Sequence, residues 1–173
     1  MYFYAKMLYE GDNIEQDKKE VSKYFKMAAD KGNIASMRKL ALMLKKGDGI
    51  EQNMEEACYY LKKAIEKGNI NALYGYGLLL MDNNYAKQNF EEAAQCFKEA
   101  ADKGNVDSMN QYSNMLYFGN KIKQDKAEAS SYYKQAAAKY LKDAADNGNA
   151  KAITVYASLL FSGYIKILAM LKQ

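Results

Sequence analysis

Residues 40–69 read LALMLKKGDGIEQNMEEACYYLKKAIEKGN. The first part places apolar residues such as Leu40 and Leu44 at the spacing of one helix face, and Gly47 ends that pattern. A second helical pattern follows and ends at Gly68-Asn69. The segment therefore predicts one helix, a turn and a second helix. We name the first helix of such a unit helix A and the second helix B.

The same unit recurs along the chain, as the Gly-Asn pairs show. The first two intervals between these pairs are 36 residues and the last is 44 residues. Position-by-position agreement at such a period is the signature of a helical repeat protein. We therefore predict an all-α fold, an α-solenoid of 36-residue helix-turn-helix repeats. We expect one repeat domain over residues 1–173, and its repeats are 1–33, 34–69, 70–105, 106–149 and a partial repeat 150–173.

Helix boundaries follow from the residues that occupy the same place in each repeat. Helix A is predicted over about 35–46, 71–82, 107–118 and 151–162, each with a left-handed glycine cap except the third, which offers Asn83. Asn53 and Glu56 form a capping box at the start of helix B, in which each residue binds the backbone amide of the other. Columns of identical or small residues support this register. They are Gln16, Gln52, Gln88, Gln124; Leu8, Leu44, Leu80, Leu116, Leu160; Ala5, Ala41, Gly77, Ser113, Ala157; and Ala28, Ala64, Ala100, Ala136.

The fourth repeat contains eight additional residues. Residues 132–139 are followed by a similar copy at 140–147, and neither copy contains glycine or proline. We therefore expect one continuous helix from about 126 to 147. Its last two turns should project past the neighbouring helices and displace the next helix A.

Composition excludes several classes of function. The chain has no histidine, which removes histidine-dependent nucleophilic catalysis and histidine-ligated zinc. Lys and Glu are interspersed, so no basic stripe for nucleic acid is present. Cys58 and Cys96 read as buried, inert thiols. We expect no signal peptide, no membrane span, no cofactor and no metal site, and a cytoplasmic location by default.

The repeats resemble the sel-1-like repeat (SLR) family. The residues that carry the resemblance are Leu40-Ala41, the turn Gly47-Asp48-Gly49-Ile50 and the run Ala28-Ala29-Asp30-Lys31-Gly32-Asn33. The third repeat departs from the pattern because it lacks both turn glycines. The resemblance implies a scaffold or adaptor without catalytic activity that binds proteins or peptides. It also makes a role associated with the endoplasmic reticulum an expectation.

Candidate contact residues lie on the face of helix A that forms the concave surface in related helical repeats. Four of them share one repeat position and form a row of aromatic and Met side chains, which is typical of protein interfaces. The predicted contact residues are Tyr9, Arg38, Lys45, Tyr74, Met81, Asn110, Asn114, Tyr117, Thr154 and Phe161. The same face also carries Tyr2, Lys6, Glu10, Leu42, Lys46, Asn71, Leu78, Asp82, Asp107, Phe118, Lys151 and Ser158.

Two other functions fit the sequence less well. An RNA-binding helical array needs base-reading side chains and a basic row in every repeat, but the row of Tyr2, Arg38, Tyr74, Asn110 and Thr154 is not basic. A hydrolase of the β-lactam class would use a Ser-x-x-Lys motif, as cysteine-rich SLR proteins suggest. The matches at 36–39 and 131–134 lie in different repeats without the companion motifs, so we read them as chance.

The end of the chain predicts either a terminal cap or self-association. Residues 165–171 are mostly apolar, whereas terminal repeats need a polar outer face. We expect this segment either to fold back as a cap or to support end-to-end association between copies of the chain.

Overall fold

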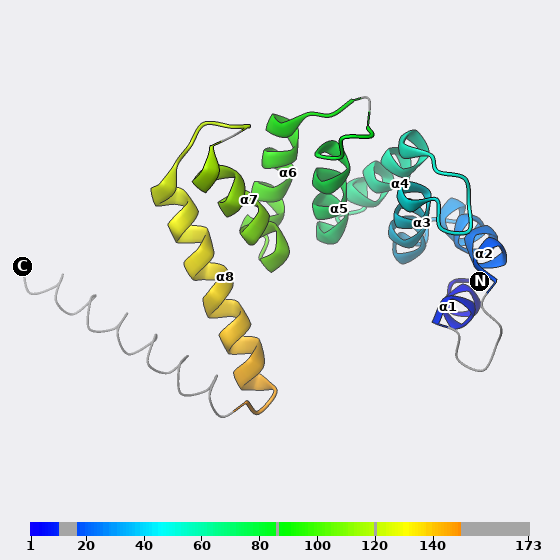
Figure 1. Ribbon diagram of the computed structural model, residues 1–173. Coiled ribbons are helices and arrows are strands. Elements are labelled where there is room, and N and C mark those ends of the chain that lie inside the picture. Colours follow the sequence, from blue (N-terminus) through cyan, green and yellow to red (C-terminus); the bar gives the residue numbers. More distant parts are fainter. Residues whose placement is uncertain (11–16, 86, 120, 150–173) are drawn as a thin grey trace, which may run out of the picture. The chain divides into compact units, whose positions relative to one another are not determined.

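The computed structural model describes residues 1–10, 17–85, 87–119 and 121–149, and all regular structure among them is α-helical. This confirms the all-α prediction. The described helices alternate between helix A, with odd numbers, and helix B, with even numbers (Figure 1). They are α1 (Tyr2–Glu10), α2 (Lys18–Asp30), α3 (Ile34–Lys46), α4 (Met54–Glu66), α5 (Ile70–Leu80), α6 (Phe90–Asp102), α7 (Val106–Phe118) and α8 (Lys126–Asp146).

The chain divides into two compact units. The first, residues 1–105, holds α1 to α6, and the second begins at Val106 and holds α7 and α8. Within the first unit each helix packs against the next one in the sequence, and α3 also contacts α5 directly. Helices α3 and α5 therefore lie side by side in this unit. The organisation into one domain and the partial repeat 150–173 stay predictions, and residues 151–162 and 165–171 lie outside the described residues.

The Gly-Asn pair joins one repeat to the next because each residue performs a separate task. Gly68 has a left-handed φ of 78°, and its amide donates to the carbonyl of Ile65 at 2.8 Å. Asn69 then caps α5, since its side-chain oxygen accepts from the amide of Ala72 at 2.9 Å. One dipeptide thus ends helix B and starts helix A, which explains the recurrence of the pair.

The start of helix B confirms half of the predicted capping box. The Asn53 side chain accepts from the amide of Glu56 at 2.9 Å, and equivalent bonds cap α2, α6 and α8. The predicted return bond from the glutamate is wrong. The amide of Asn53 donates instead to the carbonyl of Leu44 at 3.0 Å, and α6 and α8 begin in the same way. The cap therefore fixes helix B against the end of helix A.

The third repeat ends its helix A earlier than predicted. Helix α5 stops at Leu80, and Met81 follows in a right-handed conformation, so the prediction of a left-handed cap at Asn83 is wrong. The place of Gly49 in the second repeat is taken here by Tyr85. That side chain is buried and lies beside the thiol of Cys58 in α4. A packed aromatic ring thus replaces the close backbone approach that glycine makes elsewhere.

The fourth repeat contains the predicted long helix. Helix α8 runs unbroken through 21 residues, against 13 in α7. Its buried residues, Ala129, Tyr132 and Ala136, all lie before the second copy of the duplicated segment, which begins at residue 140. The second copy extends past the start of α7, beyond the bond in which Tyr140 donates to Asp107 at 3.4 Å (Figure 1). The continuous helix is confirmed, whereas its effect on the next helix A concerns residues outside the described part.

Candidate functional site

The first unit contains a groove of about 300 Å³ between three consecutive A helices. Helices α3 and α5 form its two sides, Tyr2 of α1 lies at one edge and Leu61 of α4 contributes from helix B. We call this site the A-helix groove. Its lining residues are Tyr2, Ala35, Arg38, Lys39, Ala41, Leu42, Lys45, Leu61, Asn71, Tyr74, Gly75, Leu78 and Leu79.

Repeat spacing explains why these side chains meet. Residues three and four positions apart share one face of a helix, so Arg38, Leu42 and Lys45 form a stripe along α3. Asn71, Tyr74 and Leu78 form a matching stripe along α5. Because α3 and α5 contact each other, the two stripes become the two walls of one groove. Because the sequence repeats every 36 residues, equivalent positions of helix A, such as those of Leu42 and Leu78, lie on the two facing walls.

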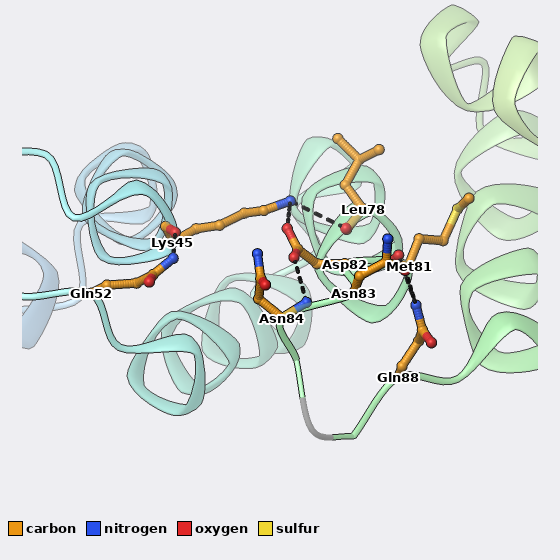
Figure 2. A network of polar contacts seen from close by, with 8 residues as sticks. All are labelled: Lys45, Gln52, Leu78, Met81, Asp82, Asn83, Asn84 and Gln88. Carbon is orange, nitrogen blue, oxygen red and sulfur yellow. Dashed lines mark hydrogen bonds and ion pairs between the residues drawn. The ribbon is translucent and has the colours of Figure 1, made fainter.

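The ends of α3 and α5 are tied together by Lys45 (Figure 2). Its ammonium lies 3.1 Å from a carboxylate oxygen of Asp82 and donates to the carbonyl of Leu78 at 3.3 Å. The other carboxylate oxygen of Asp82 accepts from the amide of Asn84 at 3.0 Å. The Asn84 amide, together with Lys45, lowers the pKa of Asp82 below its ordinary value. This link holds the two walls at a fixed separation at one end of the groove.

At the same end of the groove, glutamine side chains of one repeat position bind backbone carbonyls at the ends of the A helices. Gln52 donates to the carbonyl of Lys45 at 2.8 Å, and Gln88 donates to the carbonyl of Met81 at 3.1 Å (Figure 2). Gln124 makes the corresponding bond to Tyr117 at 2.7 Å in the second unit. The glutamines thus satisfy carbonyls at the ends of the A helices, where no further turn supplies donors.

Three of the predicted contact residues lie together in the groove: Arg38, Lys45 and Tyr74. Two others from the first unit lie outside its lining. Tyr9 is half-buried against Phe25, with the ammonium of Lys39 5.0 Å from its ring centre. Met81 is half-buried and provides the carbonyl that Gln88 caps.

The remaining predicted contact residues belong to the second unit or to undescribed residues. Asn110 is half-buried, and Asn114 accepts a bond from the hydroxyl of Tyr133 at 2.5 Å. Tyr117 is exposed beside Phe118, and their ring centres are 5.3 Å apart. Thr154 and Phe161 lie outside the described residues. Partner contact by any of these residues stays a prediction.

Sequence reasoning missed several lining residues. Residues near the stripes and one residue of helix B complete the groove. They are Ala35, Lys39, Ala41, Leu61, Gly75 and Leu79. Gly75 had a visible signal, since it is a glycine inside a helical pattern. A side chain there would crowd Leu61, whose nearest atom lies 3.1 Å from an added Cβ.

The Ser-x-x-Lys match in α3 does not form an open nucleophile site. Ser36 is fully buried, whereas Lys39 is exposed and lies over the Tyr9 ring. The cysteines are buried as predicted, and neither forms a disulfide. Burial raises the pKa of Cys96 to about 11, which keeps its thiol protonated near neutral pH.

Comparison with known proteins places this geometry in a family. The family model described as Sel1 repeat matches residues 1–33, 34–69, 70–105 and 106–141. The chain belongs to the Sel1 repeat family. The matched spans confirm the 36-residue repeat, and the fourth span ends within α8, two residues into the second copy of the duplicated segment. Sel1 repeat folds are commonly protein-interaction scaffolds and are generally non-catalytic.

Solved structures support the solenoid fold. A Sel1 repeat protein from Oxalobacter formigenes is 27% identical with a TM-score of 0.70, over 86% of this chain and 64% of that chain. The c5321 protective antigen of uropathogenic Escherichia coli, which has an SLR fold, is 18% identical with a TM-score of 0.60, over 91% of this chain and 48% of that one. Helicobacter pylori cysteine rich protein B is 20% identical with a TM-score of 0.53, over 84% and 98%.

This chain thus spans about two thirds of the length of the first of these relatives. No curated protein matches the chain. None of the described helices is long and apolar enough to cross a membrane.

Proposed function

We propose that this Sel1 repeat protein is an interaction scaffold that binds a segment of a partner protein in the A-helix groove. The observation that supports this proposal is the groove itself, which joins side chains from three consecutive repeats. Its walls combine apolar and aromatic residues with charged residues, a mixture typical of protein interfaces. The Lys45–Asp82 link holds the walls before a partner arrives, which lowers the entropic cost of binding.

The proposed role is binding without chemistry. A catalytic site needs a nucleophile or an acid–base pair within reach of a substrate. The groove lining contains no cysteine, serine or carboxylate, and its ionisable side chains are two tyrosines, two lysines and one arginine. Such a lining supports recognition through apolar contact, hydrogen bonds and charge.

The test compares two exposed apolar side chains of similar accessibility. Leu42 in the groove is 42% exposed, and Met27 on α2, outside the groove, is 46% exposed. The wild-type protein and the variants Leu42→Glu and Met27→Glu are immobilised, incubated with lysate of the source cells and analysed by quantitative mass spectrometry. We expect proteins captured by the wild type to be lost from Leu42→Glu and kept by Met27→Glu.

Circular dichroism serves as the control that both variants remain helical. Capture of the same proteins by all three forms would contradict the groove as the binding surface. Loss from Met27→Glu alone would instead assign binding to the exposed face of the first repeat.

A further inference from the structure

The lining of the A-helix groove is positively charged. It contains Arg38, Lys39 and Lys45 and no acidic residue. Two of the three cations already have partners within the protein, since Lys45 pairs with Asp82 and Lys39 lies over the Tyr9 ring. Arg38 is exposed, and no hydrogen bond or ion pair joins it to another residue in the described part of the chain. The groove therefore presents one uncompensated guanidinium.

Arg38 is also the only arginine in the sequence, although the chain has 25 cationic side chains. All the others are lysines, so solubility alone does not explain an arginine at this place. A guanidinium differs from an ammonium because its planar donors form two parallel bonds to one carboxylate. The one side chain with this geometry lies in the groove, one helical turn from Leu42.

Apolar surface adjoins the guanidinium. Leu42 lies on the same wall as Arg38, and Tyr74 and Leu78 lie on the facing wall. The groove volume of about 300 Å³ is at the lower end of the range for ligand pockets, roughly 300–1,000 Å³. The site therefore suits a large side chain of a peptide, with a negative group beside it.

We propose that the A-helix groove recognises a peptide segment in which an Asp or Glu adjoins a large apolar residue. The carboxylate pairs with Arg38, and the apolar side chain lies against Leu42, Tyr74 and Leu78. This inference rests on the proposed function, because it names the chemistry of the partner that the same groove would bind. The charge complementarity between an uncompensated guanidinium and a carboxylate supports this occupant.

The test uses a phage-displayed library of random peptides selected on the immobilised wild-type protein. We expect selected peptides to contain Asp or Glu beside Leu, Ile, Phe or Met. A selected peptide is synthesised with blocked termini, and its affinity is measured by fluorescence anisotropy. Arg38→Gln should weaken binding by about 10- to 100-fold, since a charge-assisted hydrogen bond is lost. Arg38→Lys should give an intermediate loss, because it keeps the charge and loses the planar fork.

Lys23→Gln is the matched control. Lys23 is exposed on α2, outside the groove, so its neutralisation changes the net charge by the same amount. The affinity of Lys23→Gln should remain within about twofold of wild type, because Lys23 does not line the groove and salt screens exposed charges.

A double-mutant cycle identifies the pair directly. Replacing the peptide's Asp by Asn should weaken binding to wild type and have little effect on binding to Arg38→Gln. Effects that simply add would overturn the proposal, as would selected peptides without acidic residues or a selection that yields no binder. Tighter binding of a phosphoserine peptide, or competition by single-stranded RNA at lower concentration than the peptide, would replace the carboxylate with a different ligand class.

One further variant separates this inference from the proposed function. If Leu42→Glu abolishes peptide binding and Arg38→Gln does not, the groove is the binding site and the acidic preference is wrong. If neither variant changes the affinity, both the groove and the acidic preference are wrong.

Discussion

Replacing Gly49 with alanine should destabilise the protein through two separate effects. Gly49 has a φ of 74°, and an L-residue in the left-handed conformation costs about 1–2 kcal/mol. An added Cβ would also lie 2.5 Å from the carbonyl carbon and the Cβ of Lys18, and closer still to the Lys18 carbonyl oxygen. Backbone atoms at that distance cannot move aside cheaply, so the turn must withdraw from α2.

The crowding that makes the turn withdraw adds a second part to the loss of stability. Withdrawal also removes the long contact of 3.4 Å between the Ser22 hydroxyl and the Gly49 carbonyl, which costs little because that hydroxyl donates to the Lys19 carbonyl at 2.8 Å. The sum for Gly49→Ala is about 2–3 kcal/mol when local overpacking of roughly 1 kcal/mol is added to the conformational cost. Urea unfolding followed by far-UV circular dichroism measures this change.

Gly68→Ala is the matched control for the close approach. Gly68 has a similar φ of 78°, but nothing lies within 4 Å of an added Cβ. Only the conformational cost of about 1–2 kcal/mol should appear there. A Gly49→Ala variant that loses no more stability than Gly68→Ala would refute the close packing of the turn on α2.

Three further predictions concern buried or paired polar groups. The Ser36 hydroxyl is buried without a hydrogen-bond partner in the described part of the chain, so Ser36→Ala should raise the free energy of unfolding by about 1 kcal/mol in the same urea titration; a loss of stability would contradict this. Because the pKa of Asp82 is lowered in the folded protein, its ionised carboxylate stabilises the fold at pH values above the ordinary pKa of 3.8. Acidification removes this stabilisation, so Asp82→Asn should reduce the fall in Tm between about pH 6 and about pH 3. An unchanged fall in Tm would show that the Lys45–Asp82 link does not contribute. Burial raises the pKa of Tyr76 above its ordinary 10.0, so stability should decline as the pH rises above that value, and more gently in Tyr76→Phe. Parallel declines would indicate that Tyr76 ionises equally in the folded and unfolded states.

Repeat boundaries could be predicted from the sequence because local chemistry determines them. An asparagine that directly precedes a helical pattern, such as Asn53, caps that helix. A glycine such as Gly68 adopts the left-handed conformation in which a helix ends. The partner of a side chain one turn further on depends on how the helices pack against each other. Glu92, for example, accepts from the hydroxyl of Tyr76 at 2.8 Å instead of returning to the cap amide. Local rules identify its position and not its partner.

The candidate site shows the same division. The repeat register and the likeness to related helical repeats placed Arg38, Leu42 and Tyr74 on the concave face of helix A, and the structure gathers them in one groove. The pairing of Lys45 with Asp82 could not be predicted, because the two residues belong to different repeats. It also depends on the end of α5 at Leu80, which is earlier than predicted. Leu61 was missed because it reaches the groove from helix B, between the two walls.

Site-specific photo-crosslinking tests the central claim most directly, namely that the A-helix groove holds the partner. A photoreactive amino acid replaces Leu42 in one form of the protein and Tyr59 in another, in cells of the source organism. Tyr59 lies on α4 outside the groove, and the two side chains are 42% and 50% exposed. We expect a defined crosslinked partner from position 42, abolished by Arg38→Gln, and none from position 59. The same partner crosslinked from position 59 and not from position 42 would contradict the account.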